Sequence, residues 1–137
     1  MLQNQKDIGN AIKPYYGEEA GNQLTTLLTD HITGAVPVLT AAQSGDQAAL
    51  GKALDDWYAN AEEIGVFLNT ANPEWAKMDM RHMMKTHIDQ TVTYSVDLLK
   101  KDYNAAIMNY GHAHDHMVMM AEDLARGIAI QFPDKFK

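Results

Sequence analysis

The chain has 137 residues, of which 46% are hydrophobic and 21% charged, a composition typical of one globular domain with its own core. Its 11 basic and 18 acidic residues give a net charge of −7, which disfavours a nucleic-acid partner because phosphate binding needs a basic surface. The chain contains no cysteine, so disulfides and thiolate chemistry are excluded. Any metal site must therefore use histidine, carboxylate, tyrosine or methionine.

The sequence signals of membrane and secreted proteins are missing as well. No apolar run approaches the roughly 20 residues that a membrane-spanning helix needs. The opening stretch MLQNQKDIGN does not have the basic-then-apolar order of a signal peptide. The sequence therefore predicts a cytoplasmic protein that binds neither membrane nor nucleic acid.

Apolar residues recur at the helical period along nearly the whole chain, and no stretch alternates for long enough to indicate a strand. A leading segment with Leu2, Ile8 and Ile12 predicts a short helix packed across one end of the molecule. The first long helix is expected over residues 18–42. Gly45 follows it, and glycine commonly ends a helix because it adopts the left-handed conformation without strain.

The second long helix is expected over residues 46–70, with Asp46 as its N-cap. The third is expected from Pro73 to about Lys100, with Asn72 as its cap and the proline in its first turn, where the missing N–H is harmless.

The fourth long helix is expected to begin near Asp102 and to end before the FPDKFK stretch. Short connections between long helices force neighbouring helices to be antiparallel. The sequence thus predicts an all-α protein, a single domain over residues 1–137. Its fold is an up-down-up-down four-helix bundle with a short extra N-terminal helical segment.

Three histidines lie on the faces that are expected to point into this bundle. A helical wheel with 100° per residue gives the fourth helix one apolar face. This face is formed by Tyr103, Ile107, Tyr110, Met117 and Ala121. His114 shares this direction, whereas His112 and His116 point the opposite way. The same construction places His31 and His87 on the core faces of the first and third long helices.

The three inward histidines are also expected at one height. Counting residues from each loop places them within about one helical turn of a common layer, at 1.5 Å per residue. Imidazoles that converge from several helices are one way in which bundles hold metal ions. The sequence therefore predicts a transition-metal site with His31, His87 and His114 as ligands.

The predicted ion is Zn, Fe, Cu or Ni, because imidazole suits these metals, and no organic cofactor is expected. Four residues are placed where they could support the ligands: Tyr94, Tyr110, Asn60 and Thr91. No carboxylate lies on the inward faces, which argues against a ferritin-like di-iron centre. The residues do not distinguish storage, sensing or catalysis, and no catalytic residue is assigned.

A second interpretation remains open. The same histidines, with Tyr94, Tyr110 and Thr91, could form a buried hydrogen-bonded layer in a non-catalytic structural or interaction protein that assembles as a homo-oligomer. His112 and His116, four residues apart, are more typical of a solvated helix face than of a second metal site.

Four stretches resemble a family of small uncharacterised bacterial helical proteins without an established function: NQKDIGNAIKPYYGEEAGNQLTTLLTDHI, DWYANAEEIGVFLNTANPEW, MMKTHIDQT and MAEDLARGIAIQFPDKF. The resemblance covers nearly the whole chain and implies histidines at the places of His31, His87 and His114. It also implies an additional N-terminal helix with a further histidine, which this chain lacks, and often glutamate in place of Tyr94. Loss of such a helix would uncover apolar surface, so a homo-oligomer is expected.

Overall fold

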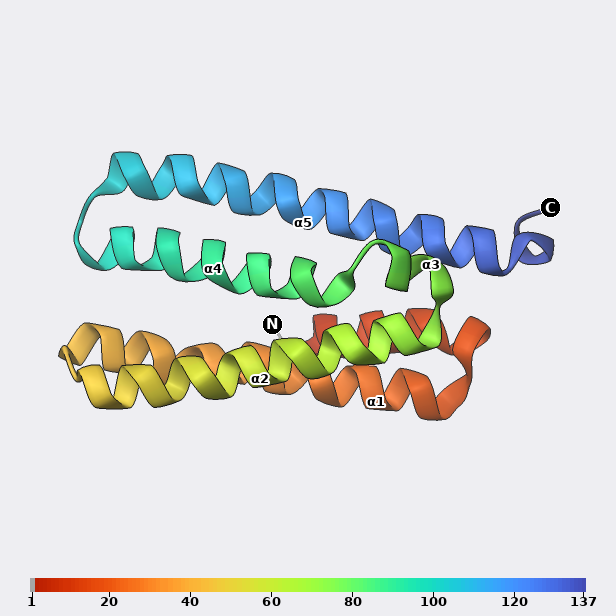
Figure 1. The fold of residues 1–137 in the computed structure, drawn as a ribbon, viewed down its shortest axis with the longest axis horizontal. Helices are drawn as coiled ribbons and strands as arrows, with labels where there is room; N and C mark the ends of the chain where they lie inside the picture. The colour runs from red at the N-terminus through yellow and green to blue at the C-terminus, as the bar shows by residue number, and fades with distance from the viewer. Residues whose placement is uncertain (1) are drawn as a thin grey trace.

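The structure is a computed structural model that describes residues 2–137, and within this range it is entirely helical (Figure 1). Its elements are α1 (Leu2–Ser44), α2 (Gln47–Ala71), α3 (Pro73–Lys77), α4 (Met80–Leu99), α5 (Tyr103–Gln131) and a short 3₁₀ helix, η1 (Pro133–Phe136). The prediction of an all-α protein is confirmed. No helix within these residues is long and apolar enough to cross a membrane.

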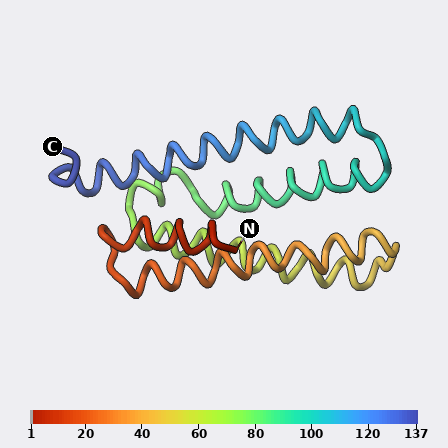
Figure 2. The backbone as a smooth tube through the Cα atoms, turned by 180° about the vertical axis from the view of Figure 1, so that it is seen from behind, coloured from red at the N-terminus to blue at the C-terminus, as the bar shows by residue number. Residues whose placement is uncertain are grey.

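Helix α1 consists of two halves that meet at Gly17, where the backbone leaves helical geometry with φ of 89°. Residues 2–16 fold back along residues 18–44 (Figures 1 and 2). Gly9 and Gly21 permit this close approach, since a Cβ on Gly9 would lie 2.5 Å from the carbonyl oxygen of Gly21. The leading segment thus packs alongside the first long helix, and the prediction that it lies across one end was wrong.

Aspartate side chains cap the starts of α2 and α5, and the cap at Asp46 confirms the prediction. The Asp46 side chain accepts a hydrogen bond from the backbone N–H of Ala49 at 2.9 Å, at the start of α2. Asp102 does the same for Ala105 at 3.1 Å, at the start of α5. A cap of this kind satisfies one of the backbone donors that the first turn leaves without a partner.

The third predicted helix is broken. Instead of one helix from Pro73 to Lys100, the structure has α3 and α4, separated at Met78 and Asp79. Asp79 adopts a left-handed conformation with φ of 52°, and its side chain accepts from the N–H of His82 at 3.3 Å. Aspartate tolerates this conformation better than most residues, so the chain turns here without glycine or proline.

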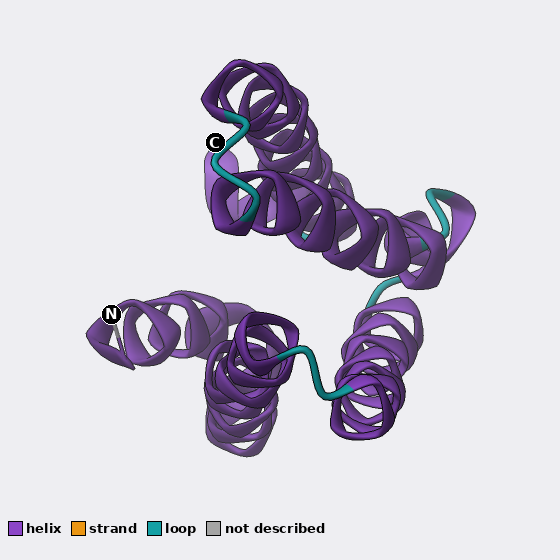
Figure 3. Cartoon of the chain, turned by 90° about the vertical axis from the view of Figure 1, so that its left-hand side faces the viewer, coloured by secondary structure: helices purple, strands orange, loops and turns teal. Residues whose placement is uncertain are grey.

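The helices form two hairpins, α1 with α2 and α4 with α5, which meet along α2 and α4 (Figures 1 and 3). The core lies at this junction. Its most deeply buried side chains are Ile64 on α2, Trp75 on α3, and Met80 and Ile88 on α4. Helices α1 and α5, which would be neighbours in a closed four-helix bundle, are not among the packed pairs. These two helices meet only at one end, where the Tyr16 hydroxyl donates to the side chain of Gln131 at 2.8 Å.

Helix α5 is rotated relative to the sequence prediction. Its buried residues are Ala106, Ala113, Met120 and Gly127, spaced seven apart. This spacing is that of a seam between two helices, here the seam against α4 and α3. The face that was predicted to point into the core is exposed: Ile107 is 73% and Tyr110 58% accessible to solvent.

Candidate metal centre

His31 lies in the second half of α1 and is only 5% exposed. Asn60 on α2 fixes its ring. Asn60 donates from Nδ2 to the carbonyl of Leu27 at 3.1 Å, so its Oδ1 accepts from Nδ1 of His31 at 2.8 Å. Because Nδ1 carries the proton, neutral His31 presents a lone pair at Nε2. Burial lowers the pKa of His31 and favours this neutral form, although the bond to Asn60 opposes the shift.

Trp57, also on α2, holds the same histidine. Its indole nitrogen donates to the carbonyl of His31 at 2.8 Å, and its ring centre lies 5.5 Å from the centre of the imidazole. Gly34 leaves room for the indole, since a Cβ there would lie 3.0 Å from the Trp57 ring. Helix α2 thus positions both the backbone and the ring of His31, as the supporting residues of a ligand histidine do.

His87 on α4 faces His31. The ring centres are 5.6 Å apart and the ring planes are inclined by 35°. Burial, followed by the charges of His31 and His116, lowers the pKa of His87 to about 4. Thr91 is one turn further along α4, and its hydroxyl donates to the carbonyl of His87 at 2.8 Å. Two imidazoles from different hairpins therefore meet in their neutral forms.

Each of these rings has a buried nitrogen without a hydrogen-bond partner, namely Nε2 of His31 and Nδ1 of His87. An ion about 2.0–2.1 Å from a ring nitrogen lies roughly 3.2 Å from the ring centre, so two rings that share a tetrahedral ion have centres roughly 5.2 Å apart. A wider angle at the ion increases this separation. The observed 5.6 Å is thus compatible with one ion held between the two rings.

His114 does not join this pair. It is exposed on α5, with Nδ1 at 3.2 Å from the carboxylate of Asp115. The prediction that His114 faces the core was wrong, because α5 turns its seven-residue seam toward α4 instead. His116, predicted to point outward, is partly buried, and its Nε2 donates to the carbonyl of Met83 on α4 at 3.0 Å. His112 is exposed, as predicted.

The predicted supporting residues divide into two groups. Asn60 and Thr91 contact the histidine pair, one through the ring of His31 and the other through the backbone of His87. Tyr94 and Tyr110 pack edge to face against each other, with ring centres 5.6 Å apart.

The described residues do not complete a metal site by themselves. Among residues 2–137, no three histidine, aspartate or glutamate side chains converge closely enough to hold an ion. An apolar cavity lies beside the pair, between α1, α2 and α4, and its lining includes Trp57 and Thr91. The remaining positions around an ion at the pair would therefore belong to water or to a bound molecule.

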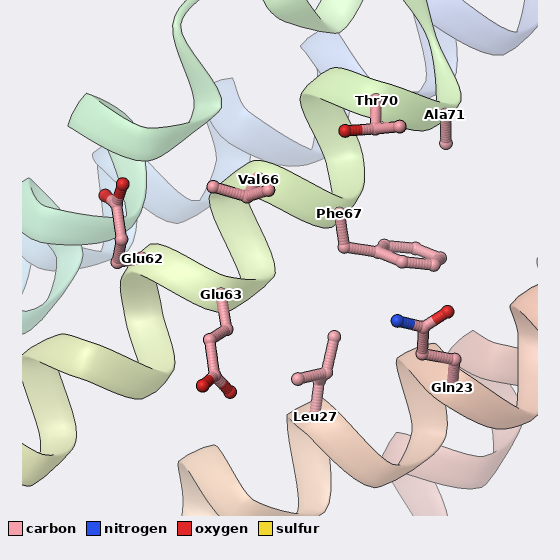
Figure 4. A pocket seen from close by; sticks show the side chains of 8 residues that line it. All are labelled: Gln23, Leu27, Glu62, Glu63, Val66, Phe67, Thr70 and Ala71. Carbon is pink, nitrogen blue, oxygen red and sulfur yellow. The ribbon is translucent and has the colours of Figure 1, made fainter.

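A larger groove between α1 and α2 contains neither histidine of the pair (Figure 4). Its lining residues are Gln23, Leu27, Glu62, Glu63, Val66, Phe67, Thr70 and Ala71. The carboxylate of Glu62 forms an ion pair with Arg81 of α4. The groove therefore combines an apolar wall with two carboxylates, one of which is paired with Arg81, and it does not extend the histidine site.

Comparison of the chain with protein-family models, with curated proteins and with solved structures gives no match. The resemblance described from the sequence therefore stays a prediction, and a function has to be inferred from the residues of this chain.

Proposed function

We propose that this protein binds a transition-metal ion between His31 and His87. The observation that carries the proposal is the pair of buried, unpartnered nitrogens on two rings whose centres are 5.6 Å apart. Zn, Cu, Fe and Ni all suit imidazole ligands. In this proposal the four long helices run up-down-up-down, and the ion lies between α1 and α4, beside α2.

Burial of the two nitrogens supports a bound ion over an unoccupied polar pair. A buried polar atom without a partner costs about 1–3 kcal/mol, and an ion would satisfy both atoms at once. The ring of His31 is already oriented, because its other nitrogen donates to Asn60. A ligand histidine usually donates its second ring nitrogen in this way. The lowered pKa values keep both rings in the neutral form that binds metal.

The histidine of α5 that lies nearer the pair is His116, not His114, but it does not converge with His31 and His87 closely enough to be a third ligand. His116 lies close enough for its charge to lower the pKa of His87. Since its Nε2 donates to Met83, neutral His116 has its lone pair at Nδ1. His114 is exposed and is excluded from the proposed site.

The test is the metal content of untagged protein purified without chelator, measured by mass spectrometry. One bound ion per chain is expected in the wild type, and the ion should be lost in His31→Gln and in His87→Gln. The exposed histidines supply matched controls, so His112→Gln and His114→Gln should retain the ion. Circular dichroism of each variant confirms that the helices are intact.

Two outcomes would overturn the proposal. One is a wild type without metal that takes up none on titration with Zn, Cu, Ni or Fe salts. The other is a His87→Gln variant that keeps the full metal content. Either result would favour the alternative, a structural or interaction protein in which His31, Asn60 and Trp57 form a polar layer within the core.

A further inference from the structure

Helix α5 has a second apolar face, separate from the seam against α4. We define the α5 strip as Tyr103, Ile107, Tyr110, His114, Met117, Val118, Ala121 and Ala125. All eight residues are exposed. The solvent-exposed fraction of the five largest hydrophobic residues lies between 39% and 73%. Their directions fall within an arc of about 100°, which is the width of a buried face on an amphipathic helix. The strip is about 33 Å long and contains no aspartate, glutamate, lysine or arginine.

Within the described chain this strip has no partner helix. Helix α5 packs on α4 and α3 through its seven-residue seam, and α1 reaches it only beyond the strip, where Tyr16 donates to Gln131 at 2.8 Å. A helix with one apolar face toward its own chain and another toward solvent is typical of an interface. The edge-to-face contact of Tyr110 with Tyr94 covers only one margin of the strip.

We propose that the α5 strip binds the same strip of a second copy, in an antiparallel twofold arrangement centred on His114. The sequence of the strip supports this arrangement, because the two outer pairs of residues that lie equally far from His114 each combine a large residue with a small one. Tyr103 would face Ala125 of the other copy, and Ile107 would face Ala121. Large side chains opposite small ones are what close helix packing requires, and a twofold interface needs a surface that is complementary to itself.

The size of the strip fits an interface with a second copy of the chain. The exposed parts of its five large hydrophobic side chains amount to roughly 550 Å², comparable to the largest apolar patch on a typical monomer. Interfaces are about three-fifths apolar, so the full contact would bury about 900 Å² on each copy, which is the size of a standard stable interface. The lack of charge in the strip also matters. Two copies with a net charge of −7 each can meet here without placing like charges opposite one another.

This inference does not depend on metal binding, and its test is carried out with chelator present. Sedimentation equilibrium at micromolar concentrations should give twice the 15.3 kDa mass of the chain for the wild type. Ile107→Asp should give the monomer mass, because a charge would be buried in the interface. Met108→Asp is the matched control. Met108 is its neighbour, is 61% exposed and points away from the strip, so this variant should stay dimeric.

The register has a separate test, since the chain has no cysteine. A His114→Cys variant should form a disulfide-linked dimer under mild oxidation, because the twofold axis places the two copies of residue 114 beside each other. A disulfide requires Cα atoms within about 7 Å. The control His112→Cys is exposed at the same height on the other side of α5 and should stay monomeric on a non-reducing gel.

Three outcomes would overturn the inference. A monomeric wild type would show that the strip is not covered by a second copy. Dissociation of Met108→Asp to the same extent as Ile107→Asp would place the interface elsewhere. Equal crosslinking of His112→Cys and His114→Cys would contradict the arrangement centred on His114.

Discussion

At the scale of single residues, the charge state of His87 links the candidate site to the stability of the fold. Burial and two neighbouring histidines lower its pKa from 6.5 to about 4. The unfolded chain therefore takes up a proton at this residue below pH 6.5, whereas the folded chain does not until about pH 4. Stability is fully present above pH 6.5 and falls as the pH is lowered through this window. The loss is on the order of 3 kcal/mol at most, at about 1.4 kcal/mol per pKa unit.

This dependence is measured by urea unfolding of metal-free protein at several pH values between 7 and 4. His31 has a lowered pKa for the same reason and contributes in the same direction. We expect His87→Gln to flatten the curve and His112→Gln to leave it as in the wild type. A wild-type free energy of unfolding that stays constant from pH 7 to pH 4.5 would contradict the burial of a neutral histidine pair.

Substitution by alanine is expected to have opposite effects on stability at two glycines of α2. A Cβ on Gly65 would lie 2.5 Å from Cα of Arg81, in the contact between α2 and α4. Gly65→Ala should therefore lower the free energy of unfolding by about 2 kcal/mol, as overpacking of a tight contact does. A Cβ on Gly51 meets no atom within 4 Å, so Gly51→Ala should stabilise the helix by about 0.5–1 kcal/mol. Chemical denaturation of both variants tests this, and equal effects of the two substitutions would contradict the close packing of α2 on α4.

The sequence predicted the burial of His31 correctly and the burial of His114 wrongly, for one physical reason. His31 and Asn60 lie on helix faces where the large apolar residues are also the buried ones, so periodicity found them. On α5 the large apolar residues form an exposed strip, and the buried seam uses small residues such as Ala106 and Ala113. The hydrophobic periodicity is dominated by the larger residues, so it predicted that His114 points inward and His116 outward, whereas His114 is exposed and His116 is partly buried. The seven-residue spacing of small residues was the pattern that could have indicated the seam.

At the scale of elements, the break between α3 and α4 depends on Asp79. This residue combines a left-handed backbone, with φ of 52°, and a side-chain cap on His82. Asp79→Val should lower the free energy of unfolding by about 2 kcal/mol, since the cap is worth about 1 kcal/mol and a β-branched residue is strained in this conformation. Asp79→Asn keeps a capping oxygen and tolerates the backbone, so its effect should stay within about 0.5 kcal/mol. Thermal unfolding of both variants measures these effects. An equal loss of stability in the two variants would show that backbone strain at residue 79 does not contribute.

The other helix limits could be predicted because each has a local chemical cause. Asp46, Asn72 and Asp102 each accept a hydrogen bond from the first turn of the helix that follows. The turn at Met78 and Asp79 was missed because no glycine or proline marks it, and the apolar spacing continues on both sides. The sequence did not predict that residues 2–16 fold back along residues 18–44. This packing depends on a contact between Gly9 and Gly21, which come together only because the chain bends at Gly17.

At the scale of the whole molecule, the two hairpins meet mainly along α2 and α4, and the histidine pair crosses the same division. His31 belongs to the first hairpin and His87 to the second. Other contacts across it include a hydrogen bond from the Tyr58 hydroxyl to Asp89 at 2.5 Å, one from the Tyr16 hydroxyl to Gln131 at 2.8 Å, and an ion pair between Glu62 and Arg81. The ion pair is largely exposed, so it contributes little to stability. An ion at the histidine pair would therefore add a buried contact between the two hairpins, which otherwise meet mainly along α2 and α4.

Because such an ion binds only the assembled hairpins, it should raise the stability of the whole chain. The expected gain is about 2.7 kcal/mol at a free metal concentration 100 times the dissociation constant. Thermal unfolding of metal-free protein with added Zn salt measures it, and Mg, which prefers oxygen ligands, should leave the midpoint unchanged. His87→Gln should abolish the increase while the exposed His114→Gln retains it. An equal rise in His87→Gln and in the wild type would mean that Zn binds elsewhere, and that apolar packing, hydrogen bonds and the exposed ion pair join the two hairpins without an ion.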